Sequence, residues 1–280
     1  MAVDANKTPE TAQIARMTPE LERFRDESLA RSEAVRKKFQ HDRGISFGPH
    51  PRQVLDVYYP SRTAGLSPVF VFLHGGGFRG GAPAGVSYMA EALLDHGVTF
   101  VASSYRLLPE VKFPDMAEDA ALALRWVHHN IRGHGGSEDR VVLSGHSAGA
   151  SLAALAGFRT GWTHRMGVPE DIVKGLVLIS GGYVNRRAGD DVNTSSPYFV
   201  PNLTEAIERT PENTIVVTAQ NDLPFCQPDA DALVAALRAR GAAHEFISAV
   251  PNTDHYFVGH KLADADGVIF AAVRTMLNLK

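Results

Sequence analysis

The sequence predicts an α/β protein: one layer of mainly parallel strands with helices on both of its faces. Short runs of apolar residues alternate along the chain with longer stretches in which apolar residues recur at helical spacing, and this alternation favours a parallel sheet. Several of the short runs, such as residues 69–73, contain no polar residue, as expected of strands buried on both faces. The chain has 280 residues, and we expect residues 18–280 to form a single domain.

Composition narrows the classes of function. The chain has 44% hydrophobic residues and a formal charge of −3, which gives no electrostatic reason to expect nucleic acid or an anionic membrane as a partner. Cys226 is the only cysteine, so no internal disulfide can form. Residues 1–17 lack the apolar segment of a secretory signal, and no apolar run is long enough to span a bilayer. We expect a cytoplasmic protein without cofactor or metal, with residues 1–17 as a flexible leader.

The first predicted element is a helix from Pro19 to about Arg43. Thr18 can cap it, Pro19 suits its first turn, and Gly44 is placed to end it. Its apolar stripe is incomplete, so we expect this segment, residues 18–44, to lie on the rest of the domain as a small cap. Strands are expected next at 53–59, 69–73 and 98–102, with a helix over 86–96 between the last two.

The second half of the chain continues the alternation. Apolar residues at helical spacing predict helices over 114–131, from Ser147 onward, over 228–240 and over 267–279. Apolar runs predict strands at 140–144, 175–180, 214–219 and 244–248. Residues 181–211 interrupt this pattern, because they are rich in Gly, Asn, Ser and Pro and are long for a plain connection. We expect that segment to be a binding loop or a small lid.

The pattern Gly145-His146-Ser147-Ala148-Gly149 falls between a predicted strand and a predicted helix. A nucleophilic serine needs a tight turn on which its backbone is strained and its neighbours are small, and the two glycines supply that room. The helix that follows would point its free N–H groups at negative charge that develops during a reaction. The pattern also occurs by chance in glycine-rich sequences, but its place between strand and helix favours Ser147 as a nucleophile.

A run of glycines follows a buried strand in His74-Gly75-Gly76-Gly77-Phe78. Glycines leave their backbone N–H groups accessible, and acyl transfer needs such donors for the oxyanion of its tetrahedral intermediate. A flexible turn and a phosphate-binding loop are the alternatives. The phosphate alternative is weakened, because neither Lys-Ser/Thr nor the dinucleotide spacing accompanies the glycines.

A serine nucleophile needs a base, and the base needs an acid to orient it. His255 lies in the loop after the last predicted strand, and Asp222 lies in the loop after the strand at 214–219. Loops at the C-terminal ends of parallel strands gather at one edge of the sheet, where Ser147 also lies. The order Ser147, Asp222, His255 along the chain is the order that accompanies such a serine turn in α/β proteins.

Other side chains compete for these roles. Asp254 could be the acid, but adjacent residues seldom aim at each other, and Asp229 is expected in the first turn of its helix. His260 is an alternative base. His128 and His129 are adjacent on a helix without a second cluster of ligands, so a solvated helix face is favoured there over a metal site.

Together, these segments resemble the hormone-sensitive-lipase-like branch of the α/β-hydrolases, and within it the small esterases and kynurenine formamidases. The matching stretches lie between about residue 50 and the C-terminus: 74–78, 104–110, 113–114, the Ser147 turn, Asp222 and His255. The resemblance implies the α/β-hydrolase fold, with its eight-stranded type of sheet, and an oxyanion hole made by the backbone N–H groups of Gly76, Gly77 and Ala148. It also implies that His74 braces the glycine loop and that Tyr105, Arg106 and Asp119 belong to the scaffold.

Two departures from this family bear on the substrate. Kynurenine formamidases typically carry His-Gly-Gly-X-Trp, whereas Phe78 follows a third glycine here, which weighs against formamide specificity. A single helix within residues 18–44 replaces the larger N-terminal cap of the lipase-like members, which favours small or medium substrates. His146 is expected to be structural or to line the pocket. The pocket residues that we expect are Phe78, His146, Tyr183, Tyr198 and Phe199.

The sequence therefore predicts an esterase that cleaves a small or medium carboxylic ester through an acyl-enzyme. Ser147 would be the nucleophile, His255 the base and Asp222 the orienting acid. The same residues could cleave an aryl-formamide, another amide or a carbamate, because these reactions share the acyl-enzyme path. A non-catalytic ligand-binding protein is the remaining alternative, since fold does not imply function, and self-association as a homodimer through a sheet edge is left open.

Overall fold

The structure is a computed structural model that describes residues 18–184 and 202–279. The predicted leader and residues 185–201 of the predicted lid lie outside the described residues. The described chain forms an eight-stranded sheet. In chain order its strands are β1 (His41–Ser46), β2 (Val54–Tyr58), β3 (Ser67–Leu73), β4 (Thr99–Ser103), β5 (Gly136–His146), β6 (Val173–Ile179), β7 (Asn213–Asn221) and β8 (His244–Asp254).

The sheet is mainly parallel, as the sequence predicts, and its strand order is β1-β2-β4-β3-β5-β6-β7-β8. The first two strands pair antiparallel, both with each other and where β2 meets β4. The strands from β3 to β8 pair in parallel. Because parallel strands end at the same edge of a sheet, the loops that follow β5, β6, β7 and β8 are neighbours there.

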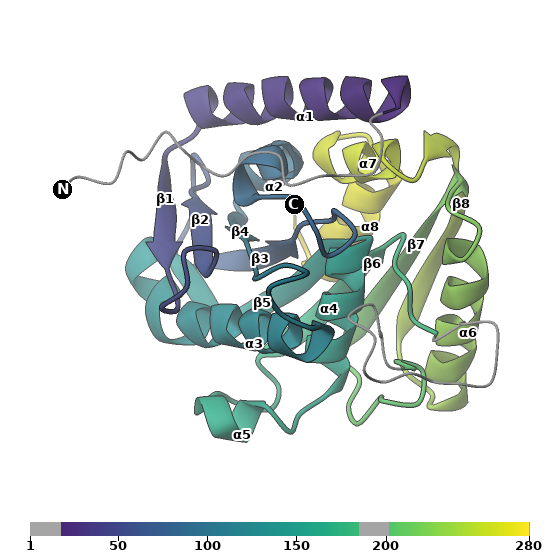
Figure 1. Cartoon of the computed structure of the whole chain (residues 1–280). Helices are drawn as coiled ribbons and strands as arrows, with labels where there is room; N and C mark the ends of the chain where they lie inside the picture. The colour runs from purple at the N-terminus through teal and green to yellow at the C-terminus, as the bar shows by residue number, and fades with distance from the viewer. Residues whose placement is uncertain (1–17, 185–201, 280) are drawn as a thin grey trace.

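Helices cover both faces of this sheet (Figure 1). Helices α3, α4 and α6 contribute to one hydrophobic cluster, and α2, α7 and α8 contribute to the other. The helices are α1 (Pro19–Lys38), α2 (Glu91–Asp95), α3 (Phe113–Asn130), α4 (Ala148–Phe158), α5 (Thr163–Met166), α6 (Cys226–Ala239), α7 (His260–Ala263) and α8 (Val268–Met276), with 3-10 turns η1 (Pro83–Gly85), η2 (Ser87–Ala90), η3 (Ile131–His134) and η4 (Phe257–Gly259).

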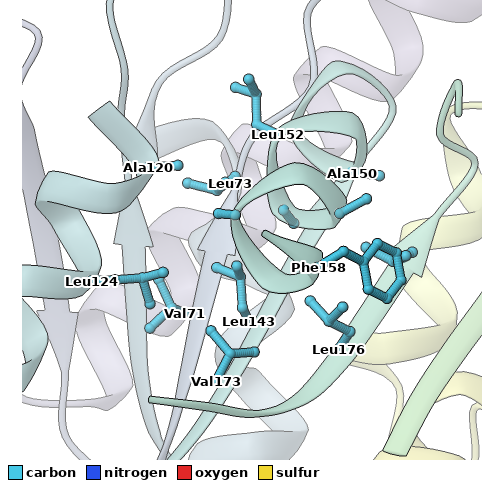
Figure 2. Close-up of a cluster of buried hydrophobic side chains, with 14 of the residues drawn as sticks. Val71, Leu73, Ala120, Leu124, Leu143, Ala150, Leu152, Phe158, Val173 and Leu176 are labelled. Atoms are coloured by element: carbon cyan, nitrogen blue, oxygen red, sulfur yellow. The ribbon is translucent and has the colours of Figure 1, made fainter. Parts of the chain in front are cut away.

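Strand β3 shows why its sequence is apolar throughout. Val71 and Leu73 belong to the cluster beneath α3 and α4, whereas Phe70 and Phe72 point to the opposite face and belong to the other cluster. Successive side chains of a strand alternate between faces, so a central strand covered on both sides has no solvent-facing position. Figure 2 shows the first cluster, in which Leu124 of α3 approaches Val71.

The N-terminal helix is shorter than the sequence predicts. Helix α1 ends at Lys38 and not near Arg43, because Phe39 turns into an extended conformation and buries its ring in the cluster beside α2. The next residues form edge strand β1. Gly44 ends no helix: with a φ of 67° it lies at an irregularity in the pairing of β1 with β2, and its N–H donates to the Asp56 carboxylate.

The remaining predicted strands and helices are confirmed, with refined bounds. The predicted helix over 86–96 divides into η2 and α2, and β7 and β8 extend to Asn221 and Asp254. None of the helices within 18–184 and 202–279 combines the length and the apolar character that a membrane crossing requires.

Helix α1 lies across the molecule beside α2 and α7 (Figure 1). The Phe24 ring packs against Tyr256 and Phe257, with ring centroids 5.7 Å and 5.5 Å apart, and Arg31 forms a 2.9 Å ion pair with Asp264. Both halves of the helix therefore contact the segment that follows His255. Its role as a cap over a substrate pocket stays a prediction.

Candidate active site

The ends of three parallel strands on one side of the sheet, β5, β7 and β8, bring Ser147, Asp222 and His255 together. Ser147 follows β5 directly, Asp222 follows β7, and His255 follows β8. The pairing register is decisive for the last two, because Asn221 and Asp254 are partners across the β7–β8 ladder. Asp222 and His255, which follow these partners, therefore lie side by side at the end of the two strands.

The three side chains form a continuous chain of hydrogen bonds. The Ser147 hydroxyl lies 2.9 Å from Nε2 of His255, and Nδ1 of His255 lies 2.6 Å from Oδ1 of Asp222. A carboxylate only accepts, so Nδ1 carries a proton and donates, which leaves the lone pair of Nε2 to accept from the hydroxyl. A serine, an imidazole and a carboxylate in this arrangement can transfer the serine proton to the imidazole.

Asp222 is held as a carboxylate. Burial raises the pKa of Asp222, but hydrogen bonds from His255, from the Ser180 hydroxyl and from the Ala219 N–H outweigh that effect and hold the pKa well below its ordinary value. A fourth donor, the Leu223 N–H, lies 2.9 Å from Oδ1. The group that faces the imidazole is therefore ionised at neutral pH.

The turn at Ser147 needs both of its glycines. Ser147 has φ 53° and ψ −120°, a conformation that non-glycine residues rarely adopt. A Cβ on Gly145 would lie 2.3 Å from the carbonyl carbon of Gly149, and a Cβ on Gly149 would lie 2.1 Å from the Leu73 carbonyl oxygen. The turn packs so closely on itself and on β3 that neither position has room for a side chain.

Three backbone N–H groups are available beside this turn. Ala148 is the first residue of α4, where N–H groups have no partner within the helix. Gly76 and Gly77 have φ values of 126° and 59°, and within the described residues their N–H groups donate to no acceptor. The Gly76 carbonyl accepts from the N–H groups of Arg79 and Gly80, which closes the glycine loop into a turn.

Arg52, His74 and Tyr105 brace the glycine loop from behind. The Arg52 guanidinium donates to the carbonyls of Gly81 and Tyr105 at 2.7 Å and 3.0 Å. The Tyr105 hydroxyl donates to the His74 carbonyl at 2.7 Å, and the two rings stack with centroids 4.4 Å apart. Burial lowers the pKa of His74 to about 3, so its neutral ring donates through Nδ1 to the Gly75 carbonyl.

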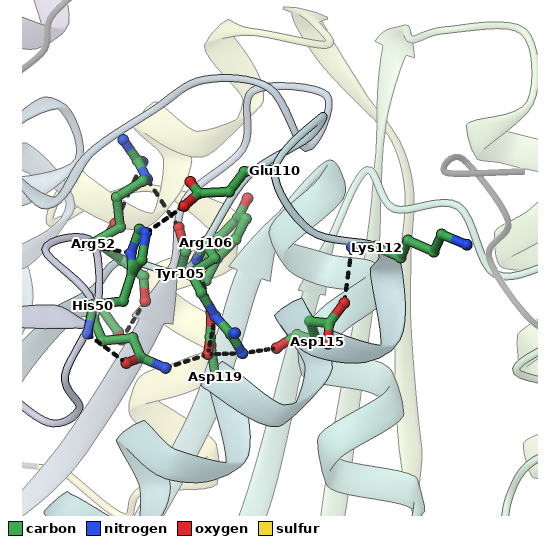
Figure 3. A network of polar contacts seen from close by, with 11 residues as sticks. His50, Arg52, Tyr105, Arg106, Glu110, Lys112, Asp115 and Asp119 are labelled. Carbon is green, nitrogen blue, oxygen red and sulfur yellow. Dashed lines mark hydrogen bonds and ion pairs between the residues drawn. The ribbon is translucent and has the colours of Figure 1, made fainter.

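A second set of contacts fixes the segment that follows β4 (Figure 3). Asp119 of α3 is fully buried and accepts from both the backbone N–H and the guanidinium of Arg106. Gln53 donates to the same carboxylate at 2.7 Å. Leu108, a few residues further along, donates its N–H to the Phe78 carbonyl at 2.8 Å, so this network also supports the glycine loop.

His146 has a structural contact in the site. Its Nε2 lies 2.7 Å from the backbone carbonyl of His255, and a Cβ on Gly75 would lie 2.8 Å from its Nδ1. Burial, together with the nearby His255, lowers the pKa of His146 to about 3, so the ring is neutral. His146 therefore links the glycine loop to the backbone of His255.

The competing candidates lie elsewhere or bind other groups. Asp254 accepts from the N–H groups of Tyr256 and Phe257. Asp229 lies in the first turn of α6, as predicted, and accepts from two backbone N–H groups. His260 packs against aromatic rings of α1 and η2, and the His128 and His129 rings contact each other on α3.

The predicted pocket residues have different outcomes. Phe78 is half-buried beside the glycine loop and packs edge-on against Phe113, with ring centroids 5.5 Å apart. Tyr183 does not line an open surface: its side chain is buried in the cluster that includes α6, and its N–H donates to the Asp229 carboxylate. Tyr198 and Phe199 lie outside the described residues.

Within the described chain, one group of side chains has the spacing of metal ligands, and it shares Asp222 and His255 with the hydrogen-bonded chain that ends at Ser147. The ligand atoms of Asp222, Cys226 and His255 lie within 4.8 Å of one another. Two of them already share the 2.6 Å hydrogen bond. Burial, followed by the Asp222 charge, raises the pKa of the Cys226 thiol well above its usual range, so the thiol keeps its proton. These residues are arranged for hydrogen bonding.

Sequence reasoning missed Ser180 and Arg52. Ser180 donates to Asp222, and Arg52 supports the glycine loop. A polar residue directly after a buried strand was a usable signal for Ser180, because Asp222 and His255 occupy the same kind of position. No pattern pointed to Arg52, whose acceptors are backbone carbonyls from distant segments.

Comparison with known proteins supports the fold and the relationship. The family model BD-FAE matches residues 55–171. Isoprenylcysteine alpha-carbonyl methylesterase ICME of Arabidopsis thaliana is 34% identical over 151 residues, covering 50% of this chain and 34% of that protein. Kynurenine formamidase of Salmo salar is 28% identical over 235 residues, covering 79% of this chain and 77% of that protein. The chain thus spans about a third of the length of the plant relatives that it matches.

Two solved structures have the same fold. Esterase B of Lactobacillus rhamnosis superposes with a TM-score of 0.69 at 20% identity, covering 92% of this chain and 93% of that one. The Pyrobaculum calidifontis esterase superposes with a TM-score of 0.68 at 23% identity, covering 92% of each chain. Together with the sheet order and the turn at Ser147, these likenesses define an α/β-hydrolase fold. The chain therefore has the α/β-hydrolase fold, and its resemblance to esterase and formamidase members of that fold group is confirmed.

Proposed function

We propose that the protein is a serine hydrolase that cleaves a small to medium carboxylic ester. The observation that carries this proposal is the hydrogen-bonded chain from the Ser147 hydroxyl through His255 to Asp222. The strained turn that carries Ser147 supports it, and so does the glycine loop beside it, where a Cβ on Gly75 would lie 3.3 Å from the Ser147 Cβ. A protein that only binds ligands has no need of both.

In the proposed mechanism, Ser147 Oγ attacks the carbonyl carbon while its proton moves to Nε2 of His255. The negative charge on the former carbonyl oxygen is stabilised by the N–H groups of Gly76, Gly77 and Ala148. Collapse of this intermediate breaks the ester C–O bond, and His255 returns the proton to the leaving alcohol. Water, deprotonated by His255, then attacks the acyl-enzyme, and the acid and free Ser147 are released.

The test is hydrolysis of p-nitrophenyl acetate by the wild type and by Ser147→Ala. We expect the variant to lose more than about 1,000-fold in kcat, because removal of a triad member leaves only oxyanion stabilisation and binding. A fluorophosphonate probe should label Ser147 in the wild type and nothing in the variant. Equal turnover by both proteins would refute the proposal, and absence of labelling would favour a non-catalytic binding protein.

A second candidate is hydrolysis of an aryl-formamide by the same residues. One relative that matches more than three quarters of both chains, the Salmo salar protein, is a kynurenine formamidase. The glycine loop argues against it, because Phe78 stands where formamidases typically carry tryptophan. A matched pair of substrates, an aryl-formamide and the corresponding aryl formate ester, separates the two candidates: kcat/KM at least tenfold higher for the formamide would overturn our preference for esters.

Location and assembly are further proposals. The Cys226 thiol is free and buried, which suits a reducing compartment such as the cytoplasm. Strand β8 ends the sheet, and a homodimer could form along that edge. Neither small-molecule hydrolysis nor the charge balance calls for nucleic acid or a membrane as a partner.

A further inference from the structure

Ser180 is the first residue after β6, the strand that lies between β5 and β7. Its φ is 51°, in the left-handed region that serine rarely occupies. Its N–H donates to the Val217 carbonyl at 2.9 Å, its carbonyl accepts from the Cys226 thiol at 3.4 Å, and its hydroxyl lies 2.5 Å from Oδ2 of Asp222. A strained backbone persists only where the surroundings over-determine it, so these contacts hold the hydroxyl in a fixed direction.

The same segment also touches the nucleophile. The carbonyl of Ile179, the residue before Ser180, accepts from the Ser147 N–H at 2.9 Å. Two successive residues thus contact the backbone of the nucleophile on one side and the carboxylate of the acid on the other. Ser180 itself is fully buried, so no water competes for its hydroxyl.

We propose that Ser180 is a positioning residue, which fixes the orientation of the Asp222 carboxylate and, through it, the imidazole of His255. This inference rests on the proposed function. It concerns the hydrogen bond from the Ser180 hydroxyl to Asp222, which is additional to the contacts among Ser147, His255 and Asp222.

The pattern of donors around Asp222 supports this role. Oδ1 accepts from His255 and from the Leu223 N–H, and Oδ2 accepts from Ser180 and from the Ala219 N–H. The two backbone donors flank Asp222 in its own segment and move with it. The Ser180 hydroxyl comes from the end of another strand, β6, so it ties Oδ2 to the adjacent part of the sheet. Without it, the carboxylate can rotate away from Nδ1 of His255.

A purely structural role makes different predictions. If Ser180 only satisfied a buried carboxylate, its removal would lower stability and leave kcat and the pH profile unchanged. The two roles can be separated because Ser180→Ala and Ser180→Gly both remove the hydroxyl, whereas glycine also relieves the strain of a positive φ. The glycine variant should therefore be the more stable of the two, and both should lose the same catalytic contribution.

The experiment measures kcat, KM and the pH profile of p-nitrophenyl acetate hydrolysis for the wild type and both variants. We expect kcat to fall about tenfold in each, as for loss of one hydrogen bond to a charged group, with KM changed less than twofold. The acid limb of the profile should move to lower pH, because a carboxylate that has turned away from Nδ1 of His255 stabilises the protonated imidazole less. Ser103→Ala is the matched control: Ser103 is a buried serine at the end of β4 whose hydroxyl donates to a backbone carbonyl, and its variant should keep the wild-type kcat.

A proton NMR measurement keeps this test independent of turnover. The Nδ1 proton of His255, held in a 2.6 Å hydrogen bond, should give a far-downfield signal that shifts in both Ser180 variants and stays in place in Ser103→Ala. If the wild type neither turns over substrate nor labels with fluorophosphonate, the proposed function fails, while a shifted signal still supports positioning. Wild-type kcat, pH profile and signal position in Ser180→Gly would overturn the inference.

Discussion

Replacing Asp119 by alanine tests the polar network that holds the segment after β4 (Figure 3). The carboxylate is fully buried and accepts from the Arg106 N–H at 2.7 Å, from the Arg106 guanidinium at 2.8 Å and from Gln53 at 2.7 Å. Without it, a guanidinium and two neutral donors lose their acceptor. Breaking one side of a buried ion pair costs about 3–5 kcal/mol. The Arg106 side chain keeps 21% exposure and can turn towards water, so we expect about 3 kcal/mol.

The assay is urea unfolding followed by tryptophan fluorescence, with a thermal scan beside it. A loss of about 3 kcal/mol corresponds to a Tm lower by roughly 6–12 °C in a chain of this size. Glu118→Ala is the matched control, because Glu118 is the preceding residue of α3 and is exposed; it should change the free energy of unfolding by less than about 0.5 kcal/mol. A loss below about 1 kcal/mol in Asp119→Ala would refute the reasoning.

Three further outcomes follow from the packing and the pKa values. Gly149→Ala places a Cβ 2.1 Å from a β3 carbonyl oxygen, so we expect lost activity and a lower Tm, whereas Gly133→Ala, with open space around it, should behave as wild type in both measurements. Burial lowers the pKa of both His74 and His146 to about 3, whereas in the unfolded chain these histidines bind protons below about pH 6.5. The free energy of unfolding should therefore fall as the pH drops from 6.5 towards 3, by about 2 kcal/mol per histidine at pH 5. Urea midpoints that are equal at pH 7.5 and pH 5 would contradict this. The Cys226 thiol is buried and its pKa is raised by that burial, so iodoacetamide should label it only after unfolding, as read by mass spectrometry.

The buried strands could be predicted because their composition leaves no alternative. A central strand covered on both faces is apolar at every position, as in β3, and such runs stand out in a sequence. The Ser147 turn was also predictable, since its two glycines are sterically required. These features depend on residues that are neighbours in the chain.

The errors lie where tertiary contacts outweigh local signals. The residues from His41 to Ser46 have no apolar run, and they form a strand only because β2 offers them an edge to pair with. Gly44 reads as a helix stop, but its positive φ serves the irregular pairing with β2. Ser180 donates to a residue 42 positions away; its place directly after a buried strand was a usable signal, but the identity of its partner depends on the tertiary structure.

The meeting of Asp222 and His255 depends on a feature of β8 that sequence patterns do not reveal. Val217 pairs with Ile247, and Asn221 pairs with Asp254, so four steps along β7 match seven along β8. The three extra residues are absorbed in bulges with positive φ at Ala249 and Asn252.

Side chains of β7 stabilise both bulges: Thr218 accepts from the Ala249 N–H, and Gln220 accepts from the Asn252 N–H, each at 2.9 Å. In a regular ladder, the partner of Asn221 would be three residues earlier, and His255 would lie about 10 Å beyond Asp222 along the strand. The irregular end of β8, more than the regular part of the sheet, therefore places the imidazole between the carboxylate and the serine.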